Sequence, residues 1–174
     1  MPTSRLFFAL PPAADVRAPL ARLAREVAAS TGGRASAEDS IHLTLAFVGD
    51  VPRERVPPLQ AIGALVDGGR FDMALDQLGG FRRARVAWIA PSAVAPALLD
   101  LQHAIGAALA GQGFPLDSRP FTAHVTLARH CRDWLPATST TPVVWPVREF
   151  ALWQSSTSGA GARYREIARW PLGD

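Results

Sequence analysis

Two histidine–threonine pairs are the residues of this chain whose types and spacing suit chemistry. The first pair, His42 and Thr44, lies in the segment IHLTLAFVG at 41–49, where apolar residues alternate with the others. This period of two predicts a half-buried β-strand that carries His42 and Thr44 on one face. The residues expected on the opposite, core-facing side are Leu43, Leu45 and Phe47. One such pair is weak evidence for a site, because short motifs often arise by chance.

A second pair, His124 and Thr126, repeats the first. Val125 and Leu127, which alternate with this pair, are again expected on the core-facing side of the strand. The chain has only four histidines. Two of them in matched strands make coincidence a poor explanation, and the pattern favours a functional pair of motifs.

The surroundings of the motifs repeat as well. An apolar run opens each half, and 35 residues separate Phe7 from His42 while 36 separate Trp88 from His124. Internal repetition of this kind decides the architecture. We expect one bilobal α+β domain over residues 1–174, with a first repeat at about 5–49 and a second at about 85–129. An approximate two-fold would bring the two histidines together across a central cleft.

The motifs and their flanking phrases resemble the 2H phosphoesterase superfamily, and within it the bacterial RNA 2′,3′-cyclic phosphodiesterases, also called 2′-5′ RNA ligases. The matching phrases are RLFFAL at 5–10, IHLTLAFVG at 41–49, RPFTAHVTLAR at 119–129 and the tail at 164–170. The resemblance implies two antiparallel sheets that face a cleft, with helices packed outside. It also implies hydrolysis of RNA 2′,3′-cyclic phosphate ends to 2′-phosphomonoesters, with reversible 2′-5′ ligation as an associated reaction.

The same resemblance implies a role for each motif residue. His42 would be the proton donor and His124 the proton acceptor, since imidazole can do either near neutral pH. The hydroxyls of Thr44 and Thr126 would hydrogen-bond the non-bridging phosphoryl oxygens as charge builds on them. This scheme requires no metal and no other cofactor.

Arg129 is the residue on which the resemblance and the strand pattern disagree. The family places an arginine at this position in the substrate pocket. Strict alternation instead puts Arg129 with Val125 and Leu127, on the face away from His124. Arg129 can reach the site only if the strand ends or bulges near Ala128.

Three alternatives stay open at this stage. A metal site could use His42, His124 and His130, although neither motif has an Asp or Glu beside its histidine. A non-catalytic RNA-binding module is the second, although no aromatic and basic surface typical of single-strand binders is evident. The third is a phosphodiesterase for another cyclic phosphate, such as ADP-ribose 1″,2″-cyclic phosphate.

Composition and charge set further bounds. With 174 residues, 48% of them hydrophobic, the chain is expected to form one globular domain. No apolar run is long enough for a signal peptide or a membrane span, so we expect a cytoplasmic monomer that acts on RNA ends and not at a membrane. All 18 basic residues are arginine, and the net charge of +3 gives only mild attraction for a polyanion. The single cysteine excludes an internal disulfide.

Periodicity and breaker residues predict the remaining elements. Helices are expected at 15–29, at 53–66 with a start delayed to Pro57, and within 91–112, where His103 should face solvent. The expected strands are 71–75, 86–90, 148–153 and 164–170. Gly79 and Gly80 suggest a turn, 135–146 an irregular connection, and 155–162 a mobile loop or hairpin turn. The arginines at 82–85 suit either a phosphate-contacting rim or a solvated loop.

Overall fold

A computed structural model describes residues 3–174 and contains three α-helices and nine strands over that range. In chain order the elements are β1 (Thr3–Leu10), α1 (Ala14–Thr31), β2 (Arg34–Ala35), β3 (Leu43–Pro52), α2 (Val56–Leu65), β4 (Phe71–Phe81), β5 (Val86–Ala90), α3 (Pro96–Gly111), β6 (Val125–Arg129), β7 (Thr138–Val147), β8 (Glu149–Ser158) and β9 (Gly161–Pro171). The α+β class is confirmed. No helix among these residues is long and apolar enough to span a bilayer.

The strands form two four-stranded halves that meet at the motifs. The order is β7-β4-β5-β6-β3-β1-β8-β9, with β2 added beside β6, and every pairing between these strands is antiparallel. We call β3, β1, β8 and β9 the first half-sheet, and β6, β5, β4 and β7 the second. Only one residue pair, Leu43 with Val125, joins β3 to β6. Each of these residues directly follows a motif histidine, so the junction brings the two motifs together.

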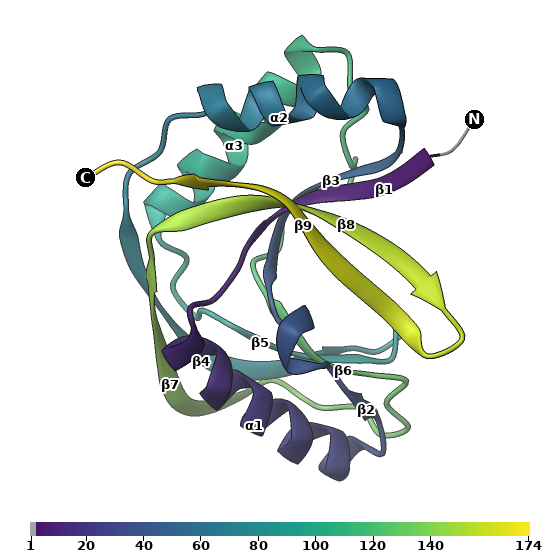
Figure 1. Ribbon diagram of the computed structural model, residues 1–174. Helices are drawn as coiled ribbons and strands as arrows, with labels where there is room; N and C mark the ends of the chain where they lie inside the picture. The colour runs from purple at the N-terminus through teal and green to yellow at the C-terminus, as the bar shows by residue number, and fades with distance from the viewer. Residues whose placement is uncertain (1–2) are drawn as a thin grey trace.

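The helices lie outside the two half-sheets, as expected, but each repeat's helix crosses to the other half. Helix α1 follows β1 of the first half-sheet and packs on β6 and β7 of the second, and on β2 beside β6. Helix α3 follows β5 of the second half-sheet and contacts β3 and α2, while α2 also packs against β8 and β9. Figure 1 shows α2 and α3 on one side of the molecule and α1 on the other, with the sheet between them.

Apolar spacing explains why these helices form and dock. In α1 the buried positions include Val16, Leu20, Ala24 and Val27, which recur every three or four residues. Helix α1 ends at Gly32, whose φ of 64° is the left-handed conformation that glycine adopts without strain. In α3 the buried stripe is Leu98, Leu101, Ile105 and Leu109, and His103 is exposed, as predicted.

Two sequence-based expectations about strands were wrong. Gly79 and Gly80 are not a turn, because β4 continues through them to Phe81 and the turn falls at residues 82–85. A Cβ on Gly79 would lie 2.4 Å from the Trp88 indole, so this glycine allows the large ring to lie against the strand. Most of 135–146 is not irregular but belongs to β7. Its two prolines are tolerated because β7 lies at the edge of the sheet, where a missing N–H costs no ladder hydrogen bond.

The last hairpin is longer and tighter than the expected loop at 155–162. Strand β8 runs to Ser158 and β9 starts at Gly161, so only Gly159 and Ala160 lie outside the strands. The hairpin projects beyond the body of the molecule on the side of β2 and β6 (Figure 1). The arginines of the 82–85 turn are exposed, and Arg85 Nε donates a hydrogen bond to the Cys131 carbonyl at 2.9 Å.

Candidate active site

The two motif histidines have the same local geometry. Each lies immediately before its strand, and its Nδ1 lies 2.7 Å from the carbonyl oxygen two residues earlier, Ser40 for His42 and Thr122 for His124. A carbonyl only accepts, so Nδ1 carries the proton and Nε2 of the neutral ring is left as an acceptor. In His42 that Nε2 lies 3.0 Å from the Thr44 hydroxyl, which therefore donates to it.

Burial makes both imidazoles weaker bases than a free histidine. The pKa of His42 falls to about 4, chiefly because the ring is buried; the Ser40 carbonyl opposes this shift, and the positive charges of Arg129 and His124 add to it. Burial also lowers the pKa of His124, again with help from Arg129. Both rings are therefore neutral at pH 7 in the free protein. The charge of Arg129 thus acts on the pKa of both histidines, and the charge of His124 acts on that of His42.

Aromatic rings surround the two histidines unequally. The rings in contact with His42 are those of Phe7, Trp153 and Tyr164, with centroids 5.0, 5.2 and 5.2 Å away. His124 contacts Phe81, edge-on, at 5.0 Å. His42 is thus enclosed by a small apolar cluster on the face of the first half-sheet opposite the main core. This enclosure accounts for its strong desolvation.

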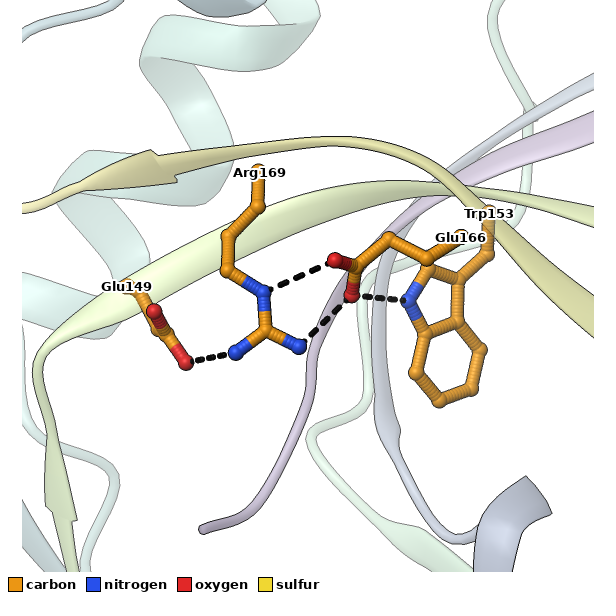
Figure 2. A network of polar contacts seen from close by, with 4 residues as sticks. All are labelled: Glu149, Trp153, Glu166 and Arg169. Carbon is orange, nitrogen blue, oxygen red and sulfur yellow. Dashed lines mark hydrogen bonds and ion pairs between the residues drawn. The ribbon is translucent and has the colours of Figure 1, made fainter.

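A chain of polar contacts, shown in Figure 2, fixes the ring of Trp153, which contacts His42. The indole Nε1 of Trp153 donates to the Glu166 carboxylate at 3.3 Å. Arg169 holds that carboxylate through two hydrogen bonds of 2.9 and 2.7 Å, and it also binds Glu149. A bidentate guanidinium–carboxylate pair fixes orientation as well as charge, so it limits how far the indole can tilt away from His42.

A β-bulge in each motif strand changes which side chains reach the cleft. In β6, Thr126 pairs with Trp88 and Ala128 with Ala87, which leaves Leu127 as the extra residue. Leu127 and Ala128 are consecutive and both buried, so alternation shifts there and Arg129 moves to the face of His124. The bulge near Ala128 therefore places Arg129 on the face that the family resemblance implies, although strict alternation would place it on the opposite face.

The matching bulge in β3 overturns one expectation. Phe8 pairs with Ala46 and Ala9 with Thr44, so Leu45 is the extra residue there. Phe47 was expected on the core-facing side with Leu43 and Leu45. It is instead 48% exposed and contacts the Phe7 ring at 5.8 Å, on the face of His42.

A cavity of about 260 Å³ opens beside the motifs, between β2, β6 and the β8–β9 hairpin. Three predicted residues line it: His42, Thr126 and Arg129. Arg34 and Tyr164, which also line it, had no role in the sequence analysis, and His130 was named there only for the metal alternative. The lining contains no carboxylate, so the cavity is suited to an anion. The other two motif residues, Thr44 and His124, are not part of this lining.

The residues that would support a metal ion are sparse. Across residues 3–174, no three His, Cys, Asp or Glu side chains are grouped closely enough to hold one. His130 lines the same cavity as His42, but the cavity offers no carboxylate to complete a site. Metal independence remains a prediction that chelation tests directly.

Comparison with known proteins agrees with this geometry. The sequence profile of the LigT like Phosphoesterase family matches the chain twice, over residues 10–88 and 89–164. The chain belongs to this family. This chain is 31% identical to an RNA 2′,3′-cyclic phosphodiesterase of Escherichia coli K12, and the alignment covers 97% of this chain and 96% of the relative. It is also 31% identical to a Thermus thermophilus protein of the same name, over 97% of this chain and 90% of the relative.

Solved structures show the same LigT-like fold. The crystal structure of E. coli LigT complexed with 3′-AMP superposes with a TM-score of 0.89 at 29% identity, covering 99% of this chain and all of that one. A crystal structure of a Thermus thermophilus protein gives a TM-score of 0.83 at 28% identity, with 97% of each chain covered. The predicted superfamily and the antiparallel α+β architecture are thus confirmed.

Proposed function

We propose that this protein hydrolyses RNA 2′,3′-cyclic phosphodiester ends to 2′-phosphomonoesters, with His42 as general acid and His124 as general base. The observation that carries the proposal is the matched pair of imidazoles, each anchored through Nδ1 and each keeping Nε2 for chemistry, beside a cavity lined by basic side chains. The relatives named RNA 2′,3′-cyclic phosphodiesterase cover almost the whole chain and support the same reaction class.

In this mechanism a water molecule attacks phosphorus in line with the bond to O3′. The Nε2 atom of His124 takes the proton of the water as its oxygen bonds to phosphorus. The P–O3′ bond breaks, and O3′ takes a proton from Nε2 of His42, which leaves the phosphate on O2′. Solvent then returns both rings to their starting states. General acid and base assistance of this kind contributes typically about 10²–10⁴-fold each.

The low pKa of His42 fits this role once substrate is present. Free His42 is neutral at pH 7, but a bound phosphate anion favours the imidazolium and raises its pKa. An imidazolium with a reduced pKa is also a stronger proton donor toward an alkoxide leaving group. Arg129 and the Thr126 hydroxyl, which share the cavity, would hydrogen-bond the non-bridging oxygens as negative charge accumulates.

Ligation follows from the same chemistry. If a 5′-hydroxyl replaces water as the nucleophile, His124 removes its proton and the product is a 2′-5′ phosphodiester. The reverse reaction regenerates the cyclic phosphate. In the reverse direction the two histidines exchange roles: His42 takes the proton of O3′, and His124 protonates the leaving 5′-oxygen.

The test is a panel of cyclic phosphates with products resolved as 2′- or 3′-phosphates. The panel holds the four nucleoside 2′,3′-cyclic phosphates, an oligoribonucleotide with a cyclic phosphate end, and ADP-ribose 1″,2″-cyclic phosphate, each with and without EDTA. We expect 2′-phosphates, unaffected by EDTA, and a loss of about 10²–10⁴-fold in His42→Ala and His124→Ala. The exposed His103, changed to alanine, is the control. Activity lost to EDTA and restored by Zn²⁺ would replace this scheme with the metal alternative.

The division of labour between the histidines needs its own substrate. A cyclic phosphate with sulfur in place of O3′ has a leaving group that needs no proton. It should rescue His42→Ala and leave His124→Ala slow. Rescue of His124→Ala instead would reverse the two roles.

A further inference from the structure

Arg34 lies directly opposite Arg129 in the β2–β6 pairing, and both side chains line the cavity beside His42. Neighbouring strands seldom place like charges opposite each other, because the arrangement is destabilising. Here it adds a second guanidinium to a cavity that already has one beside the proposed reacting phosphate.

No carboxylate balances these two charges. Among residues 3–174, neither Arg34 nor Arg129 forms an ion pair, and no acidic side chain lines the cavity. A second polar hollow on the same half-sheet as Phe7 offers a contrast. Its arginine, Arg5, is paired with Asp50 at 3.5 Å, and both line that hollow. Of the arginines that line these two hollows, Arg34 and Arg129 are the ones without a paired carboxylate.

The two arginines are not expected to share one phosphate group. The Arg34 guanidinium reaches the β8–β9 hairpin, where a Cβ on Gly161 would lie 3.7 Å from its Nη1. Tyr164, which contacts the His42 ring, lies three residues further along β9, roughly 10 Å at the usual rise of a strand. The Arg34 guanidinium thus lies beside the start of β9, and the ring that contacts His42 comes from further along the same strand. The cavity of about 260 Å³ is close to the lower end of the range for small-molecule sites, which suits a nucleotide better than a single ion.

We propose that Arg34 binds the phosphate on the 5′ side of the terminal nucleotide while the cyclic phosphate occupies the histidine site. The protein then selects a nucleotide or an oligonucleotide with that second phosphate over a nucleoside cyclic phosphate that lacks it. This inference rests on the proposed function, because it takes the cyclic end to lie between His42 and His124. His130, which lines the same cavity, adds a second donor at its rim.

The experiment compares adenosine 2′,3′-cyclic phosphate with the same compound carrying a 5′-phosphate. We expect kcat/KM to be about tenfold or more higher for the 5′-phosphorylated substrate, mostly through KM, since hydrogen bonds between charged groups have this strength. Arg34→Gln should reduce the ratio of the two kcat/KM values to within about twofold of one. Arg22→Gln, on the exposed face of α1, should keep the wild-type ratio. A wild-type ratio near one, or a ratio that survives Arg34→Gln, overturns the proposal.

A binding measurement separates this inference from the proposed function. By calorimetry, adenosine 2′,5′-bisphosphate should bind about tenfold more tightly than adenosine 2′-phosphate, and Arg34→Gln should abolish the difference. If neither cyclic substrate turned over but this difference held, the proposed reaction would be wrong and the second phosphate site would stand. Equal binding of the two ligands by the wild type would remove the site whatever the activity. Thermal melting of Arg34→Gln checks that the variant is folded.

Discussion

Leu45 and Leu127 hold the same place in the two motifs: each lies three residues after its histidine, and each is the residue that the neighbouring strand leaves unpaired. The two bulges turn the residues at the fifth position, Phe47 and Arg129, onto the histidine face of the sheet. The two motif strands thus have matching backbones, but at this position β3 carries an aromatic ring and β6 carries a guanidinium. The site is asymmetric in its substituents although its motifs repeat.

The first prediction concerns Arg129. Arg129→Ala should lower kcat/KM by about 10- to 100-fold, because a hydrogen bond between charged groups contributes about 1.5–3 kcal/mol. Arg129→Lys should recover only part of this loss, since an ammonium group cannot bind a phosphate bidentately. Steady-state kinetics on an RNA cyclic phosphate end measures both variants. Full activity in Arg129→Ala would show that the guanidinium faces the cleft without serving the reaction.

The second prediction links His42 to acid stability. The pKa of His42 is about 4 in the folded protein and 6.5 in a free histidine, so between these pH values the unfolded chain binds more protons. The free energy of unfolding should therefore fall as pH drops from 6.5 to 4, by about 3 kcal/mol from this residue. Urea denaturation across that range should show a flatter pH dependence for His42→Gln than for the wild type. Parallel curves would contradict it, and His103→Gln serves as the exposed control.

The third prediction concerns the ring that shields His42. Because burial is the largest cause of the low His42 pKa, Trp153→Ala should raise that pKa toward 6.5 by admitting water. Trp153→Phe keeps a ring in place and should leave the pKa closer to the wild-type value. Titration of the histidine resonances by NMR gives the values directly. An unchanged pKa in Trp153→Ala would mean that Phe7 and Tyr164 alone exclude water.

The fourth prediction tests how α2 docks. A Cβ on Gly63 would lie 2.3 Å from the Trp170 ring, whereas nothing lies within 4 Å of a Cβ on Gly106 in α3. Gly63→Ala should destabilise the protein by about 1–3 kcal/mol, because Trp170 must shift within a packed core. Gly106→Ala should stabilise it by roughly 0.5–1 kcal/mol, the usual helix preference for alanine. Chemical denaturation of both variants provides the comparison, and equal effects would contradict the packing.

Patterns within single strands predicted that each motif histidine shares a face with its threonine. The directions of Phe47 and Arg129 depend on how neighbouring strands pair. Residues two apart on a strand share a face, so the placement of His42 with Thr44, and of His124 with Thr126, follows from spacing within one strand. The bulges depend on partners in other strands, so spacing alone could not show where Phe47 would point. Arg129 reaches the face of His124 only through a bulge in β6, which could be proposed from the sequence but not demonstrated from it.

The residues that the sequence did not assign lie across strand pairs from the motifs. Arg34 enters the cavity only because β2 pairs with β6, and Trp153 reaches His42 only because β8 pairs with β1. A sequence signal that could have pointed to Trp153 is the alternation of 148–153, but it does not identify the facing strand. The repeat boundaries at 5–49 and 85–129 within one bilobal domain stay a prediction.

The crossed packing of the helices has a consequence for synthesis of the chain. Helix α1 leaves the ribosome early, but β6 and β7, on which it packs, are made more than 90 residues later. Strand β1 likewise cannot complete its pairing until β8, its neighbour on one side, has been synthesised. Neither half can bury its apolar face while it is being made, so the native structure forms only near the end of translation. Until then its apolar strand faces and unpaired strand edges are exposed, a state that favours aggregation.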